Sequence, residues 1–204
     1  MGWYSDQVVP RVLVAMMRGR EYQQLRARTL AGLHGEVLEI GFGAGLNVPF
    51  YPDRVTRVQA VDPAAIGRKL AAKRLAASPV PVEFAGTDAQ QLPAGDQSVD
   101  SVLSTWTLCS IPDPGRALAE VRRVLRPGGA LYFIEHGLSP DPGVARTQRR
   151  LTPLQRAVAG GCHLDRPVGQ LLTAAGLELT RLQTYYASGP RAQAYTFEGV
   201  ATRS

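Results

Sequence analysis

A short apolar run that ends in a glycine-rich turn constrains this chain more than any other feature. Residues 37–45 read VLEIGFGAG, so a β-prone segment leads directly into Gly41, Gly43 and Gly45. Glycine has no Cβ, and it therefore tolerates positive φ and lets another molecule approach the main chain closely. A buried strand followed by such a turn predicts a ligand site, although a tight strand-to-helix connection without a ligand has the same local pattern.

The spacing of the glycines narrows the class of ligand. The dinucleotide-binding fingerprint is G-x-G-x-x-G, and here Leu46 holds the position of its third glycine. This residue disfavours an NAD-dependent oxidoreductase, which stays as one alternative.

The composition predicts a globular chain with one domain. Of its 204 residues, 45% are hydrophobic and 20% are charged, as in ordinary globular proteins. The 23 basic and 17 acidic residues give a net charge of +6, but the arginines are scattered and form no stripe with aromatic residues. We therefore expect no nucleic-acid partner, whereas a basic surface still allows peripheral contact with an anionic membrane.

The cysteines and the N-terminal apolar stretch bear on the compartment. Cys109 and Cys162 have no C-x-x-C partner and no Cys/His spacing typical of metal ligands, so we expect neither a disulfide framework nor a metal site. Residues 8–17 are apolar, but Pro10 and Arg11 interrupt them and the stretch is too short to span a bilayer. We expect no transmembrane segment and a cytoplasmic location.

Strand-like and helix-like segments alternate along most of the chain. One or two amphipathic helices are expected over residues 10–33, followed by helices at 64–77, 114–125, 154–159 and 168–175, with a polar, proline-bearing stretch from 139 to 153. Strands are expected at residues 37–40, 55–61, 82–85, 98–105, 130–135, 177–185 and 192–201. The last two strands have no helix between them and should pair antiparallel. The pattern predicts an α/β fold with a doubly wound, mostly parallel seven-stranded sheet and an antiparallel edge strand.

Polar residues follow the predicted parallel strands. Asp62 ends the second strand and can accept hydrogen bonds from ribose hydroxyls, while Asp88 and Ala89 follow the third strand and suit an adenine ring. Thr105 and Trp106 end the fourth. Each aspartate also has a structural alternative, because Asp62 could cap the next helix and Asp88 could form a turn.

Together with residues 125–131 (LRPGGAL), these motifs resemble the class I S-adenosylmethionine (SAM) methyltransferases, whose Rossmann-like fold matches the one expected above. The resemblance implies that Glu39 orders the methionine amino end of SAM, directly or through water, and that the glycines let the methionine tail lie on the backbone. The cofactor-binding residues it implies are Glu39, Gly41, Gly43, Gly45, Asn47, Asp62, Pro63, Asp88, Ala89, Thr105 and Trp106.

Four longer phrases are similar to a narrower group, the methyltransferase-like enzymes that methylate small alkyl thiols. They are NVPFYP at 47–52, TLCSI at 107–111, LYFIEH at 131–136 and GCHLDR at 161–166. The similarity implies that SAM is the methyl donor, that S-adenosylhomocysteine (SAH) is the product and that the acceptor is small and apolar, with a thiol as the best guess. It also implies a single methyltransferase domain over 1–204, with N-terminal helices at 1–34 that form a lid and acceptor pocket, a SAM-binding core at 35–136, and an insertion, the last helix and the antiparallel strands at 137–204.

In-line methyl transfer needs few catalytic side chains, because alignment supplies much of the acceleration. His136, at the end of the fifth predicted strand, is the candidate general base, since imidazole titrates near neutrality. A purely local role at the strand end is the alternative. The residues expected around the acceptor are Tyr4, Met17, Leu108, Cys109, His136 and His163.

Other functions remain open at this stage. The same motifs fit a quinone or other small-molecule C- or O-methyltransferase and a phospholipid N-methyltransferase. A non-catalytic SAM-binding module is a further alternative from a different class. The sequence names neither the acceptor nor the oligomeric state.

Overall fold

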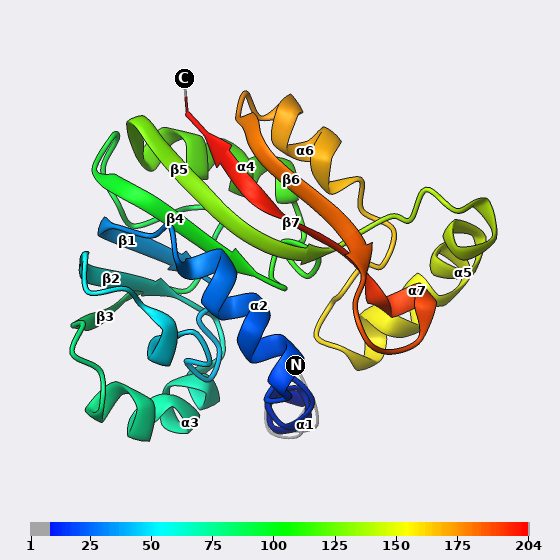
Figure 1. Cartoon of the computed structure of the whole chain (residues 1–204), viewed down its shortest axis with the longest axis horizontal. Coiled ribbons are helices and arrows are strands. Elements are labelled where there is room, and N and C mark those ends of the chain that lie inside the picture. Colours follow the sequence, from blue (N-terminus) through cyan, green and yellow to red (C-terminus); the bar gives the residue numbers. More distant parts are fainter. Residues whose placement is uncertain (1–8, 204) are drawn as a thin grey trace.

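The protein is built around one twisted seven-stranded sheet (Figure 1), and its computed structural model describes residues 9–203. The strand order is β3-β2-β1-β4-β5-β7-β6. The strands are β1 (Gly35–Ile40), β2 (Val55–Val61), β3 (Val82–Gly86), β4 (Val99–Thr105), β5 (Leu125–His136), β6 (Glu178–Tyr186) and β7 (Tyr195–Thr202). The first five strands pair in parallel, whereas β7 runs antiparallel to both β5 and β6. The predicted fold class is confirmed, and the antiparallel strand β7 lies between β5 and the edge strand β6.

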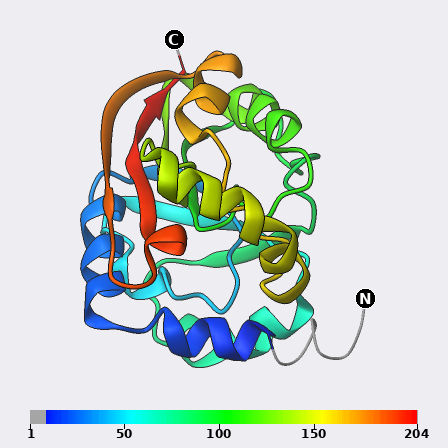
Figure 2. The same ribbon diagram turned by 90° about the vertical axis from the view of Figure 1, so that its right-hand side faces the viewer.

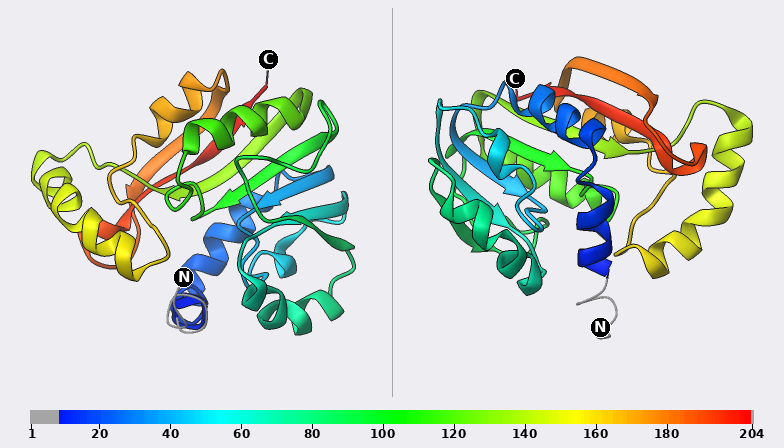
Figure 3. Two further views of the ribbon diagram at one scale, coloured as in Figure 1. Left: turned by 180° about the vertical axis from the view of Figure 1, so that it is seen from behind. Right: turned by 60° about the horizontal axis from the view of Figure 1, so that its bottom comes forward.

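Helices cover both faces of the sheet (Figure 3). They are α1 (Val9–Met16), α2 (Arg20–Leu30), the 3₁₀ turn η2 (Val48–Phe50), α3 (Ala65–Ala76), α4 (Pro114–Val124), α5 (Pro142–Val158), α6 (Val168–Ala174) and α7 (Arg191–Ala194). On one face, Leu118 of α4 and Leu172 of α6 share a core with Leu38 of β1. On the other, Leu30 of α2 and Ala71 of α3 share a core with Val37. Val37 and Leu38 are neighbours in β1, so their side chains point to opposite faces and β1 is apolar on both sides.

The helix α5 starts earlier than the sequence predicted. We expected a polar stretch from 139 to 153, but the helix begins at Pro142, directly after the N-cap Asp141. The Asp141 side chain accepts hydrogen bonds from the amides of Gly143 (2.8 Å) and Val144 (3.3 Å). An aspartate followed by proline at the first helical position is a helix start signal.

One buried glutamine fixes α5 to the end of the sheet. Gln148 is 1% exposed, and its amide nitrogen donates to the carbonyls of Gly137 and Ala192 at 2.9 and 3.2 Å. Its side-chain oxygen accepts from the amide of Ser139 at 2.9 Å. These bonds hold α5 beside α7 and across the end of β5 (Figure 2). The short helix α7 itself occupies the beginning of the strand expected at 192–201.

No helix in the part of the chain that the structure describes is both long and apolar enough to cross a bilayer.

Candidate active site

A cavity of about 410 Å³ opens at the carboxyl ends of the parallel strands. Strand order reverses between β1 and β4, and crevices at such a point are the usual ligand sites of open α/β sheets. Its walls come from the turn after β1, the residues that follow β2, β3 and β4, and the N-terminal helices. The segments that the sequence marked at four strand ends therefore meet in one place.

The glycine turn forms the floor of the cavity, and its glycines are required for different reasons. Gly41 has φ +72°, and a Cβ there would lie 1.9 Å from Oγ1 of Thr107. A Cβ on Gly43 would meet nothing closer than 3.9 Å, so the space above this residue is open. Gly45 is buried against Ala71 and, unlike Gly41 and Gly43, does not line the cavity. It shapes the turn instead.

Asp62 joins the end of β2 to the glycine turn. Its Oδ2 accepts a hydrogen bond from the amide of Gly43 at 2.7 Å, and its Oδ1 accepts one from the amide of Ala64 at 2.7 Å. Burial raises the pKa of Asp62, and the two backbone donors oppose that shift. The carboxylate lines the cavity, so its remaining lone pairs face the space that a ligand would fill.

Glu39 lies beneath the cavity wall instead of in it. The side chain is fully buried, with Oε1 accepting from Nδ2 of Asn47 at 2.9 Å and Oε2 accepting from the hydroxyl of Tyr51. Asn47 lines the cavity and also donates to Oγ1 of Thr105 at 2.9 Å. Burial raises the pKa of Glu39 from 4.5 to about 7. Glu39 is therefore connected to the cavity through Asn47.

Arg26 is a site residue that the sequence did not reveal. It is 3% exposed and comes from α2, and its Nε donates to Oδ1 of Asn47 at 3.0 Å while Nη1 donates to the carbonyl of Met17 at 2.9 Å. Its guanidinium carbon lies 4.9 Å from the ring centroid of Trp106. Desolvation lowers its pKa to about 10, so it stays cationic near neutral pH. Among the described residues that line the cavity, Arg26 is the one basic side chain.

Trp106 adopts a backbone conformation that is unusual for a bulky residue. Its φ is +51°, and its amide donates to the carbonyl of Ile134 at 2.7 Å. The indole meets the ring of Tyr22 edge-on at a centroid distance of 5.4 Å. Contacts from α2 and β5 together hold this strained residue in the cavity wall, and strain of this kind is typical of ligand sites.

The opposite end of the cavity is formed by Thr87, Asp88 and Ala89. The Asp88 side chain is exposed, and its Oδ1 accepts from the amide of Gln90 at 2.8 Å and from Nε2 of Gln90 at 3.1 Å. These two hydrogen bonds lower the pKa of Asp88. A carboxylate thus stands at this end of the cavity as well.

Comparison with known proteins decides the family. Residues 38–133 match the methyltransferase domain family. The thiol S-methyltransferase TMT1B of Rattus norvegicus is 35% identical over 171 residues, and the match covers 76% of this chain and 69% of the rat protein. The chain belongs to the SAM-dependent methyltransferases. The phosphatidylethanolamine N-methyltransferase of Cereibacter sphaeroides is 27% identical and covers 79% of this chain and 80% of the relative. A SAM-dependent methyltransferase of Thermotoga maritima shares the fold, with a TM-score of 0.70 and 22% identity over the whole of both chains.

The cavity of this methyltransferase fits its cofactor, SAM. SAM carries a carboxylate, a ribose with two hydroxyls and an adenine ring, and the cavity offers a cation at Arg26, a hydrogen-bond acceptor at Asp62 and a second carboxylate at Asp88. The open space above Gly43 lets a ligand lie on the backbone. Of the expected cofactor residues, those that line the cavity are Gly41, Gly43, Asn47, Asp62, Pro63, Asp88, Ala89, Thr105 and Trp106.

Of the residues expected around the acceptor, some line the cavity and others do not. Met17 lines the cavity, together with Val14 of α1 and with Ser110, Ile111 and Gly160. Ser110 and Ile111 belong to the phrase TLCSI at 107–111, whereas Val14 and Gly160 lie outside the motifs quoted from the sequence. Tyr4 lies outside the described residues.

Four residues expected around the acceptor do not line the cavity. Leu108 is 2% exposed and belongs to the main core, because the chain turns inward after Trp106. Cys109 is equally buried, packs with Cys162 and lies 3.5 Å from it between sulfur atoms. Nδ1 of His163 lies 3.1 Å from the carbonyl oxygen of Cys109, which turns this imidazole toward the backbone. Nδ1 of His136 is buried, and a ring nitrogen of this residue lies within 4.8 Å of the sulfurs of Cys109 and Cys162.

Proposed function

We propose that this methyltransferase methylates a small apolar thiol. The observation that carries the proposal is the chemistry of the acceptor side, where Val14, Met17 and Ile111 supply apolar side chains and the described lining residues include no histidine, lysine or cysteine. Such a wall suits an acceptor that is apolar and supplies its own nucleophile. The relative that is 35% identical carries thiol S-methyltransferase in its name, which supports the same acceptor class.

The polar groups of the cavity support a specific arrangement of the cofactor. In this arrangement Asp62 accepts hydrogen bonds from the ribose hydroxyls, and the methionine tail lies over Gly41 and Gly43. Arg26 pairs with the methionine carboxylate, while Asn47, oriented by Glu39, faces the amino group. Asp88 and the Ala89 amide hold the adenine ring, and Pro63 lies beside them. Each assignment matches the charge or the hydrogen-bonding capacity of a group that lines the cavity.

SAM supplies an electrophilic methyl group on a sulfonium sulfur. The thiolate sulfur forms a bond to the methyl carbon as the carbon–sulfonium bond breaks, and the bonding pair neutralises the departing sulfur. A thiol with a pKa of about 8.5 is partly ionised at neutral pH and gives its proton to water. The chain's task is to align the acceptor and exclude water, and alignment supplies roughly 7–11 kcal/mol in favourable cases. Because His136 does not line the cavity, the proposal assigns no general base.

The N-terminal segment completes the proposal. α1 and α2 contribute Val14, Met17 and Arg26 to the cavity, so residues 1–34 would cover both the methionine end of the cofactor and the acceptor. The core at 35–136 would hold the rest of the cofactor, and residues 137–204 would add the outer part of the acceptor side.

An acceptor screen tests the proposal. The purified protein is incubated with SAM and, separately, with a small alkyl thiol, a demethylated quinol and phosphatidylethanolamine vesicles, and SAH release is measured. We expect release with the thiol above the rate without acceptor. Release with the phospholipid or the quinol alone would contradict the proposal and would favour the activity named for the Cereibacter sphaeroides relative or a quinone methyltransferase.

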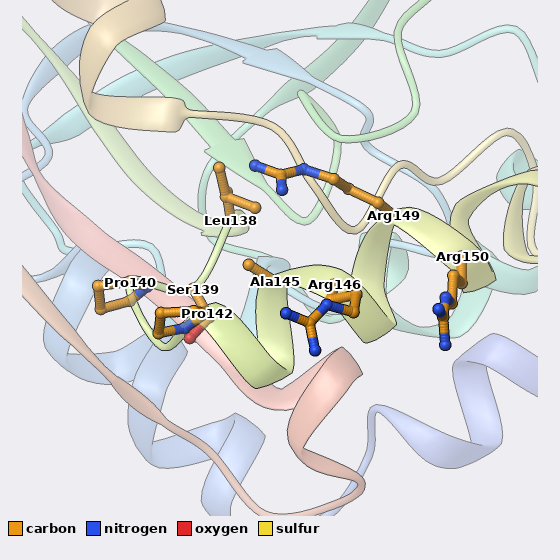
Figure 4. A pocket seen from close by; sticks show the side chains of 8 residues that line it. All are labelled: Leu138, Ser139, Pro140, Pro142, Ala145, Arg146, Arg149 and Arg150. Atoms are coloured by element: carbon orange, nitrogen blue, oxygen red, sulfur yellow. The ribbon is translucent and has the colours of Figure 1, made fainter.

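We also infer peripheral contact with an anionic membrane through α5. Leu151, Leu154 and Val158 are 38%, 62% and 45% exposed and recur at the spacing of one helix face. Arg146, Arg149 and Arg150 of the same helix surround a surface hollow of about 570 Å³ (Figure 4). An apolar helix face beside a basic one is the pattern of helices that lie in a bilayer surface.

Vesicle sedimentation tests this contact. We expect binding to vesicles that contain phosphatidylglycerol, weaker binding to neutral phosphatidylcholine vesicles, and loss of binding in Leu154→Glu. Leu182 of β6 is 41% exposed and away from α5, so Leu182→Glu is the matched control. Equal sedimentation of wild type and Leu154→Glu would contradict the inferred contact.

A further inference from the structure

Two cysteines and a histidine from distant parts of the chain meet outside the cavity. Cys109 lies in the loop after β4, His136 is the last residue of β5, and Cys162 follows α5. Their ligand atoms, two sulfurs and a ring nitrogen, all lie within 4.8 Å of one another. This cluster takes no part in the proposed methyl transfer, and it lies immediately behind the acceptor wall, because Ser110 and Gly160 line the cavity.

The spacing of the two sulfurs excludes a disulfide bond in this structure and is compatible with a shared metal ion. The sulfurs are 3.5 Å apart and both thiols are free. A disulfide requires about 2.05 Å between the sulfurs. Two thiolates on one tetrahedral zinc ion, each with a bond of about 2.3 Å, lie roughly 3.7 Å apart. The observed spacing is thus close to that of a shared metal ion.

The histidine gives a second, independent observation. Nδ1 of His136 is buried and has no hydrogen-bond partner among the described residues. A buried nitrogen without a partner is costly, and such atoms are rare unless a ligand or an ion satisfies them. A metal ion between this nitrogen and the two sulfurs would satisfy it.

The charges around the cluster also fit a divalent cation. Glu135, next to His136, is fully buried, and Arg166 is 7% exposed nearby, with its Nη1 donating to the carbonyl of Leu108. Glu135 and Arg166 offset each other in charge, so two buried thiolates would require two further positive charges. A dication supplies them.

We propose that Cys109, His136 and Cys162 bind one Zn²⁺ ion. Two thiolates and an imidazole are ligands that zinc prefers, and a fourth position is left for water. The ion would join the loop after β4, the end of β5 and the segment after α5, and so fix the wall that carries Ser110, Ile111 and Gly160. This site goes beyond the proposed thiol methylation and does not depend on it.

Zinc content measures the proposal directly, without any activity assay. The protein is purified under thiol-protecting conditions, loaded with zinc, dialysed against metal-free buffer and analysed for metal. We expect about one zinc per chain, as three protein ligands would hold a single ion. We expect loss of that zinc in Cys162→Ser and in His136→Asn, and retention in His34→Asn, whose imidazole is exposed and far from the cluster.

Two further measurements test the proposal even if a variant folds poorly. SAH binding reports that each variant retains its fold. Cobalt loaded in place of zinc should give a sulfur-to-metal charge-transfer band in wild type, and these are the chain's two cysteines, so the band can come from no other thiol. Wild type without bound zinc, equal zinc in a folded Cys109→Ser/Cys162→Ser variant, or a Cys109–Cys162 disulfide found by mass spectrometry after thiol alkylation would each overturn the proposal.

Discussion

The carboxylate of Asp62 accepts a hydrogen bond of 2.7 Å from the amide of Gly43, and this contact joins the ends of β2 and β1 beneath the cavity. The same carboxylate accepts from Ala64 at the start of the segment that leads into α3. One side chain therefore fixes the glycine turn and also presents acceptor lone pairs to the cavity. Shape and ligand binding are coupled at this residue.

Replacing Asp62 with alanine should weaken SAH binding. Hydrogen bonds to charged groups contribute roughly 1.5–3 kcal/mol each. The loss of one such bond to the ribose therefore predicts an affinity lower by about one to two orders of magnitude. Titration calorimetry measures the change, and the rise in Tm caused by SAH should largely disappear. Asp53→Ala removes an exposed aspartate from the turn before β2 and is the control. An unchanged SAH affinity in Asp62→Ala would refute the assigned role.

Replacing Gly41 with alanine should cost more stability than the same change at Gly128. Both glycines have similar positive φ, +72° and +76°, so both variants pay about 1–2 kcal/mol for the left-handed backbone. A Cβ at Gly128 meets nothing within 4 Å, whereas at Gly41 it meets Thr107. Denaturant unfolding should therefore give a lower free energy of unfolding for Gly41→Ala than for Gly128→Ala. Equal losses would show that the Thr107 side chain moves aside without cost.

The raised pKa of Glu39 predicts that the contribution of this residue to the free energy of unfolding falls as pH rises. The folded chain holds this proton up to about pH 7, and the ordinary value is 4.5. The stabilisation is complete below the ordinary value and is lost as pH rises through the folded pKa. The Glu39→Gln variant cannot ionise at this position and serves as the reference. The difference in free energy of unfolding, wild type minus Glu39→Gln, should therefore decrease as pH rises from about 4.5 to 7. Urea unfolding of both proteins at several pH values measures this difference, and parallel curves would contradict a buried, proton-binding Glu39.

Arg26→Met should weaken the binding of SAH but not of 5′-methylthioadenosine. The assigned partner of Arg26 is the methionine carboxylate, which methylthioadenosine lacks. A charge-assisted pair contributes roughly 1.5–3 kcal/mol, and its loss predicts SAH binding weaker by about one to two orders of magnitude. Arg20→Met, at the exposed start of the same helix, is the control. Equal weakening for both ligands would show that Arg26 acts by shaping the wall around Trp106 and Asn47.

The sequence revealed those features whose cause is local. The alternation of strands and helices follows from periodicity, and β2 runs over the predicted residues 55–61. Gly41 and Gly43 are visible because only glycine suits their backbone, and Asp62 and Asp88 are visible because each directly follows a strand. Parallel strands bring their carboxyl ends to one edge of a sheet, so a position in the sequence already implied a position at the site.

Features that depend on contacts between distant segments could not be predicted from the sequence. Arg26 reaches the cavity only because α2 packs beside the loop that carries Trp106, and no local pattern separates it from the arginines around it. The inward turn after Trp106 buries Leu108 and brings Cys109 to Cys162, 53 positions further along the chain. Sequence alone thus determined the fold class, because repeating patterns are local, and the resemblance of its motifs to the SAM methyltransferases indicated the cofactor. The tertiary structure decided which side chains line the cavity and which form the cysteine–histidine cluster, because long-range packing determines which side chains meet.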